Sequence, residues 1–139
     1  MRLWHKDLIG VLPRQQMLGQ WRECCAIASN IHSKGSPNHI LVNKIMEYPL
    51  KHFYSYGLAV GIELEYRGYS IDFDRFTKFF SDEDKHLVPG YRLFLDWHND
   101  RYLAQCLCNL QEKRDCGGIS DEEWLEIEKS FGGHRTIWI

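Results

Sequence analysis

The stretch MLGQWRECCAIA, residues 17–28, has the spacing of a helix with one buried face. Its apolar residues recur at i, i+1, i+4, i+7, i+8 and i+11, on one stripe of an α-helix: Met17, Leu18, Trp21, Cys24, Cys25 and Ala28. A second face carries Gln16, Gly19, Gln20 and Glu23, with Arg22 beside it. Because proline suits the first turn of a helix, we predict that this helix begins at Pro13 and covers residues 13–29.

Two further long helices are predicted, over residues 49–67 and 98–118. The first begins at Pro49 and is followed by Gly68, which suits a helix C-terminus. The second ends at Gly117 for the same reason. Gly57 and Gly61 lie one turn apart in the first of these helices. Because glycine has no side chain, we expect a neighbouring helix to approach closely at this point.

The remaining elements are shorter. A short helix is predicted over residues 39–48, whereas residues 69–95 are typical of an extended loop with irregular turns. Ser120 and Glu123 have the spacing of a capping box, which predicts a last short helix over residues 121–131. The fold class that follows is all-α, a compact domain with three principal helices.

Length and hydropathy limit the kind of protein. A chain of 139 residues is long enough for one well-packed core, so we predict a single helical domain over residues 1–139. No apolar run reaches the roughly 18 residues of a membrane span, and the first ten residues lack the apolar core of a signal peptide. We expect a cytoplasmic monomer with no membrane partner.

Five cysteines occur, but their spacing does not suit a zinc site. Cys24 and Cys25 are adjacent, one residue separates Cys106 from Cys108, and no CxxC pair is present. On a helix the latter two side chains point roughly 200° apart, so they cannot share one metal ion. We expect thiols buried in helices.

Charge is distributed unevenly along the chain. Residues 1–56 contain seven Lys or Arg against three Asp or Glu, and residues 57–139 contain ten against sixteen. Two interpretations are equally consistent with this imbalance. Either the N-terminal half forms a face for a polyanion, or the difference arises by chance from an acidic C-terminal region.

The first 25 residues carry a motif of the form R-L, then L-x-x-Q, then W-R-E. Its members are Arg2, Leu3, Leu12, Gln15, Trp21, Arg22 and Glu23. This pattern resembles the pyrimidine-dimer DNA glycosylase family, the endonuclease V-type enzymes of phage and bacteria. A weaker similarity continues through the helix over residues 49–67 to about residue 115, and the specific part is the N-terminal motif.

The resemblance implies a fold and a chemistry. The fold is a compact all-α domain in which the N-terminal segment lies between helices and brings its amine to Glu23. The implied activity on damaged double-stranded DNA, with pyrimidine dimers as the lesion, combines hydrolase (glycosylase) and abasic-site lyase reactions. The α-amine of Met1 would form an imine at the sugar C1′, with Glu23 as acid and base and without metal or cofactor. An α-amine has an ordinary pKa of about 7.7–8.0, so it is more nucleophilic near neutral pH than lysine.

Four residues are candidates for DNA contact. Arg2 and Arg22 would hold phosphates on either side of the lesion, and Gln15 and Gln16 would line the site. Each of these residues also has an interpretation without a role in function. Arg22 could be solvated, Arg2 could pair with an acid and order the N-terminus, and the two glutamines could simply be exposed on a helix. For Glu23, the alternative is a solvated carboxylate beside a Gly19 that admits a neighbouring helix.

The chain also departs from the family pattern. Arg2 follows Met1 directly, and a bulky second residue normally blocks removal of the initiator, so Met1 itself would supply the amine. Ala26 stands where the family has a further arginine, and Gln16 where it has a histidine. The C-terminal region is acidic rather than aromatic and basic, which weakens non-specific DNA affinity.

Two other function classes compete with the repair enzyme. The first is a non-enzymatic helical binding module that kept the fold without the chemistry. The second is a metal-dependent hydrolase using Glu63, Glu65 or the acidic run DEEWLEIE, although carboxylates at i and i+2 do not share a helix face. In the sequence DWHND, His98 with Asp96 and Asp100 could imitate a catalytic site, but an Asp or Asn at a helix start is more often a cap.

Overall fold

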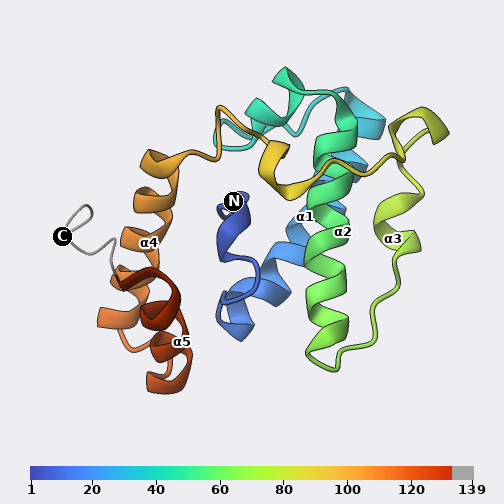
Figure 1. The fold of residues 1–139 in the computed structure, drawn as a ribbon. Coiled ribbons are helices and arrows are strands. Elements are labelled where there is room, and N and C mark those ends of the chain that lie inside the picture. Colours follow the sequence, from blue (N-terminus) through green and yellow to red (C-terminus); the bar gives the residue numbers. More distant parts are fainter. Residues whose placement is uncertain (133–139) are drawn as a thin grey trace.

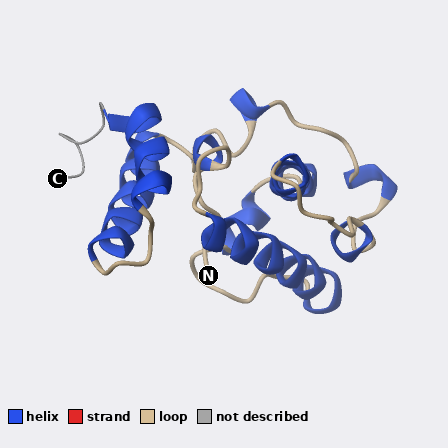
Figure 2. Cartoon of the chain, turned by 90° about the horizontal axis from the view of Figure 1, so that it is seen from below, coloured by secondary structure: helices blue, strands red, loops and turns tan. Residues whose placement is uncertain are grey.

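The computed structural model describes residues 1–132, and within this range every regular element is helical, with no strand (Figures 1 and 2). The α-helices are α1 (Arg14–Lys34), α2 (Leu50–Tyr66), α3 (Asp74–Thr77), α4 (Asp100–Asp115) and α5 (Asp121–Phe131). The 3-10 helices are η1 (Lys6–Leu8), η2 (Asn43–Glu47), η3 (Asp82–Asp84) and η4 (Gly90–Arg92). The predicted all-α class is therefore confirmed. The three longest helices are the three predicted as principal, with α5 as the predicted short one.

Helix α1 is longer than predicted. It continues past residue 29 to Lys34 and ends at Gly35, whose left-handed φ of 80° lets its N–H donate to Ile31 O. The prediction ended at residue 29 because the sequence beyond it is polar, whereas in the structure residues 29–31 are half-buried and residues 32–34 form an exposed last turn. The predicted short helix over residues 39–48 reduces to η2.

The predicted buried face of α1 is correct in its centre. Met17, Trp21, Cys24 and Ala28 are buried, whereas Leu18 and Cys25 are half-buried. Two buried residues lie outside the predicted stripe, Ile27 and Gln20. The sequence pattern placed Gln20 on a second face with Gln16 and Glu23, and its side chain is buried there because it packs against the N-terminal segment.

The two glycines of α2 are contacted by aromatic rings. A Cβ at Gly57 would lie 2.1 Å from Cζ of Phe76, and one at Gly61 would lie 2.6 Å from Cε1 of Phe73. Phe76 lies in α3 and Phe73 directly before it, inside the region that was predicted to be irregular. Close approach at these glycines was therefore expected correctly, and the partner is a single helical turn carrying two phenylalanines.

Helices α4 and α5 lie side by side, apart from α1, α2 and α3 (Figures 1 and 2). The predicted capping box is present: the Ser120 side chain accepts from Glu123 N, and the Glu123 carboxylate accepts from Ser120 N. The other carboxylate oxygen of Glu123 accepts from Arg14 N at 2.7 Å. Glu123 thus caps α5 and also caps the start of α1. The N-cap residue of α1 is Pro13, whose side chain has no acceptor for the free N–H groups of the first turn.

The N-terminal segment lies between α4 on one side and α1 and α2 on the other (Figure 1). Leu3, Trp4 and His5 are all buried, and Leu8 follows them into the core. No helix within residues 1–132 is long and apolar enough to cross a membrane.

Candidate active site at the N-terminal segment

Side chains from three helices and one loop bind the backbone of the N-terminal segment. The Tyr102 hydroxyl of α4 donates to Leu3 O at 2.5 Å, and the Tyr56 hydroxyl of α2 donates to Trp4 O at 2.6 Å. Lys6 N donates to Nδ1 of His98, just before α4, at 2.9 Å. An extended segment outside a helix or sheet has no regular backbone hydrogen bonds. These side chains therefore satisfy its backbone N–H and C=O groups and fix its position.

Gln20 of α1 supplies the remaining bonds and is 1% exposed. Its Oε1 accepts from Trp4 N at 2.7 Å and lies 2.9 Å from the Tyr56 hydroxyl, whose single proton is shared between this oxygen and Trp4 O. Its Nε2 donates to Arg2 O at 2.9 Å and lies 3.4 Å from Oε2 of Glu23. One amide therefore connects the residue after Met1 to the candidate catalytic carboxylate.

Glu23 is half-buried on the next turn of α1. Gln20 connects it to the backbone of Arg2, the residue after Met1, and Met1 itself is 42% exposed. Among residues 1–132, no ion pair within 4.0 Å joins the Met1 amine to Glu23. The structure places the N-terminal segment beside Glu23, with Met1 exposed at its end.

The space next to Gly19 is open. A Cβ built there would meet only Nη2 of Arg22, at 3.9 Å, so no neighbouring helix packs against this glycine. Arg22 is exposed on the same side of α1. The alternative in which Gly19 admits a neighbouring helix is therefore wrong, and Glu23 is partly covered rather than fully solvated.

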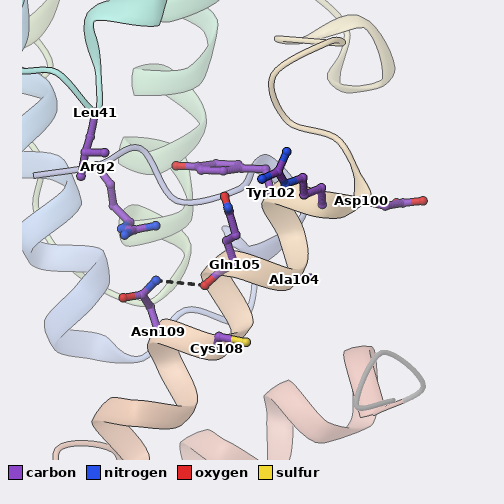
Figure 3. A pocket seen from close by; sticks show the side chains of 9 residues that line it. Arg2, Leu41, Asp100, Tyr102, Ala104, Gln105, Cys108 and Asn109 are labelled. Carbon is purple, nitrogen blue, oxygen red and sulfur yellow. Dashed lines mark hydrogen bonds between the residues drawn. The ribbon is translucent and has the colours of Figure 1, made fainter. Parts of the chain in front are cut away.

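Arg2 extends from the N-terminal segment toward α4 (Figure 3). Its guanidinium lies over the Trp4 ring at 5.3 Å from the centroid and 4.0 Å from Sγ of Cys106. It borders a hollow of about 700 Å³ whose other side is formed by α4 residues including Tyr102 and Gln105. No acid lies within ion-pair distance of Arg2 among residues 1–132, so it does not order the N-terminus by pairing with one.

The two candidate glutamines lie at the start of α1, near the loop before α5. Gln15 is exposed and Gln16 is half-buried, and both border a smaller hollow with Glu123. The buried Oε1 of Gln16 has no hydrogen-bond partner among the described residues. Gln16 and Glu23 lie at i and i+7, on the same side of α1 as the buried Gln20 at i+4.

Burial keeps the groups around the N-terminal segment neutral. It lowers the pKa of His98 to about 2, with positive charge on nearby His5 and Lys6 adding to the effect, and it also lowers the pKa of His5. Burial raises the pKa of Tyr56 and of Tyr102 above the ordinary range. Near pH 7 the phenols therefore stay donors and Nδ1 of His98 stays an acceptor, as their hydrogen bonds require.

Two carboxylates of the competing metal hypothesis have other roles: Glu63 forms an i,i+4 ion pair with Arg67 at 3.5 Å, and Glu123 of the acidic run caps α5. In the sequence DWHND, Asn99 is the N-cap of α4 and accepts from Tyr102 N at 2.9 Å. Cys24 and Cys106 are buried, as expected for cysteines in helices, but Cys108 and Cys116 are exposed, which corrects that prediction for these two. No group of three or more metal-ligating side chains occurs within residues 1–132.

Sequence reasoning missed the residues that hold the N-terminal segment. Tyr56 and Tyr102 lie 52 and 99 positions from the backbone groups that they bind, and no local pattern connects such distant partners. For Gln20 the sequence does contain an indication, because this residue lies between the candidates Gln16 and Glu23 on the same side of the helix.

Comparison with known proteins identifies the family. The family model described as pyrimidine dimer DNA glycosylase matches residues 1–77, more than half of the 139-residue chain. The match covers the N-terminal segment, α1 and α2, and it ends before the residue near 115 to which the sequence similarity was expected to extend. No curated protein and no solved structure matches the chain. The chain belongs to the pyrimidine dimer DNA glycosylase family.

Proposed function

We propose that this chain excises a damaged base from pyrimidine-dimer-containing duplex DNA and then cleaves the abasic strand, using the Met1 α-amine as nucleophile. The observation that carries the proposal is the amide of Gln20, which donates to Arg2 O at 2.9 Å and lies 3.4 Å from the Glu23 carboxylate. The family supports the glycosylase activity, and this geometry supports the choice of nucleophile and acid.

The proposed reaction begins with a new bond between the Met1 nitrogen and the sugar C1′. The C1′–N glycosidic bond breaks, its electron pair leaves with the base, and the base takes up a proton. The amine loses a proton and the sugar ring opens, which gives an imine. Removal of a C2′ proton then breaks the C3′–O bond, and the 3′ phosphate leaves with that electron pair. Water hydrolyses the imine and restores the free amine.

Glu23 takes two roles in this scheme. Its carboxylate stabilises the positive charge that develops at C1′, and it then carries protons during imine formation and elimination. Half-burial strengthens this electrostatic effect, since fewer waters screen the carboxylate. No ion pair within 4.0 Å joins Met1 to Glu23 among residues 1–132, so the scheme requires the terminal amine to approach this carboxylate when DNA binds.

DNA contacts are assigned to the outward face of α1 and to Arg2. Gln15 and Gln16 lie at one end of this face, and Arg22 lies beside Glu23. Arg2 has no acid partner among the described residues and borders the hollow in Figure 3, so its charge is available to a phosphate. Reaching C1′ requires distortion of the duplex, so the bound DNA is kinked or has an extrahelical nucleotide.

Two labelled duplexes test the proposal, one with a cyclobutane pyrimidine dimer and one with an abasic site. Wild-type protein with a free Met1 amine is expected to incise both in the presence of EDTA, while Glu23→Gln incises neither. Glu65→Gln, which changes an exposed glutamate of α2, is the matched control and keeps the activity. Binding of both duplexes without incision would instead favour the non-enzymatic binding module, which the acidic C-terminal region also favours.

A further inference from the structure

A second hollow, of about 310 Å³, lies between α1 and α3 and is bordered by three cations. Arg22 comes from α1, whereas Arg75 and Lys78 come from α3 and the residue that follows it. The rest of the lining is small or apolar and consists of Cys25, Ala26, Ser29 and Phe79. Positive charge from two elements far apart in the sequence thus converges on one surface depression.

Helix α1 leaves this depression open because the side chains of α1 that line it beside Arg22 are small. Arg22 and Ala26 lie at i and i+4, and Ser29 follows at i+7, so all three share one face. Ala26 is exposed, and its methyl group does not fill the space between α1 and α3. The floor therefore accepts a ligand group, and Ser29 adds a hydroxyl donor at one end.

The three cations have no acidic partner. None of them takes part in an ion pair within 4.0 Å among residues 1–132. The nearby carboxylate of Asp72 accepts from Asp74 N at 3.1 Å, at the start of α3. The ammonium of Lys78 lies over the Phe79 ring at 5.1 Å, which positions it at the rim without neutralising it.

The position of the hollow relates it to the candidate catalytic site. Ala26 and Ser29 lie three and six residues beyond Glu23, which is about 4.5 and 9 Å along the helix axis. One DNA strand advances about 3.4 Å per nucleotide, so a strand that passes Glu23 along α1 reaches the hollow within roughly one to three nucleotides.

We propose that this hollow binds a phosphate of the DNA backbone next to the lesion, with Arg75 and Lys78 acting together with Arg22. This inference rests on the proposed function because that function supplies the ligand, duplex DNA. It does not require the imine chemistry to be correct. The contacts position the strand against Glu23 and do not read the base sequence.

The test measures DNA binding separately from incision. Fluorescence anisotropy with a fluorescein-labelled duplex that carries a tetrahydrofuran abasic analogue gives Kd over a range of NaCl concentrations, without any cleavage. We expect Arg75→Ala with Lys78→Ala to raise Kd roughly 10-fold and to reduce the salt slope by about 1. The matched control, Lys85→Ala with Lys113→Ala, removes two exposed cations outside the hollow and is expected to leave Kd within about 2-fold.

A second pair of variants acts from the other side of the hollow. Ala26→Glu places a carboxylate on its floor, and Ala26→Gln places a neutral group of the same size there. Both substitutions fall on an exposed helix position and use good helix formers, so both proteins are expected to fold. Ala26→Glu should weaken binding at least 10-fold more than Ala26→Gln.

The outcomes separate this inference from the proposed chemistry. If the wild-type protein incises DNA but the Arg75 and Lys78 variant binds like its control, the hollow is not a phosphate site and the proposed function stands. If the wild type binds without incision and the same variant weakens binding as expected, the phosphate site stands and the chemistry fails. Equal binding by Ala26→Glu and Ala26→Gln, or no binding of DNA by the wild type, would also overturn the inference.

Discussion

Replacement of Gln20 by leucine tests how the N-terminal segment is held. Leucine is close to glutamine in volume, so it fills the same space, but it removes the acceptor of Trp4 N–H and the donor to Arg2 O. The first of these groups is fully buried and the second is partly buried. Leaving a buried polar group without a partner costs about 1–3 kcal/mol. We therefore expect Gln20→Leu to lower the free energy of unfolding by about 2–4 kcal/mol.

Urea denaturation at pH 7 measures this loss, with Gln16→Leu as the matched control on the same helix. Because Oε1 of Gln16 is buried without a partner, its replacement should leave stability unchanged or raise it. Both variants replace glutamine by leucine on the same helix. Effects of helix propensity and side-chain volume therefore cancel in the difference between their free energies of unfolding.

Gln20→Glu separates positioning from stability. The carboxylate still accepts from Trp4 N–H and from the Tyr56 hydroxyl, but it opposes Arg2 O and the Glu23 carboxylate with negative charge. We expect a roughly 10- to 100-fold slower rate of imine trapping on abasic DNA, since small displacements of reacting groups cost that much. A Gln20→Leu protein as stable as Gln16→Leu, together with a Gln20→Glu protein that traps at the wild-type rate, would refute this reasoning.

Three further predictions concern stability. Because burial holds the pKa of His98 at about 2, the unfolded chain binds an extra proton below about pH 6.5, and stability falls as the pH falls through this range. Urea titrations should show a loss of about 2 kcal/mol between pH 7 and pH 5 and a smaller loss for His98→Gln, and a flat wild-type profile would contradict this prediction. Gly57→Ala places a Cβ 2.1 Å from Phe76 and should cost about 3 kcal/mol, whereas Gly10→Ala, with open space around it, should be neutral. Glu123→Ala removes acceptors from α5 and from Arg14 N, so it should cost about 1–2 kcal/mol in thermal or urea unfolding; a loss below 0.5 kcal/mol would show that the cap is dispensable.

Local signals in the sequence predicted the helices accurately. The bounds of α5 were correct because a capping box is formed by Ser120 and Glu123 within the same turn. The end of α1 was placed five residues too early, since its last turns are polar and only Gly35 marks the stop. Helix α3 was missed because a single turn is stabilised by the packing of Phe73 and Phe76 on α2, not by its own sequence.

The candidate site was predictable only in part. The motif around Glu23 and the location of the N-terminal segment between helices follow from the resemblance to the family. The hydrogen bonds that fix the segment depend on Tyr56, Tyr102 and His98, whose positions are set by the packing of α2 and α4. Tertiary contacts of this kind have no sequence signature, so the structure was needed to find them.

The most direct test of the account is borohydride trapping on an abasic-site duplex, with the adduct mapped by mass spectrometry. Untagged protein with a free Met1 amine is used beside the same protein acetylated at its N-terminus and beside Glu23→Gln. We expect an adduct on the Met1 nitrogen that both changes abolish. An adduct on a lysine side chain, or no adduct from protein whose free N-terminus has been verified, would contradict the proposed mechanism.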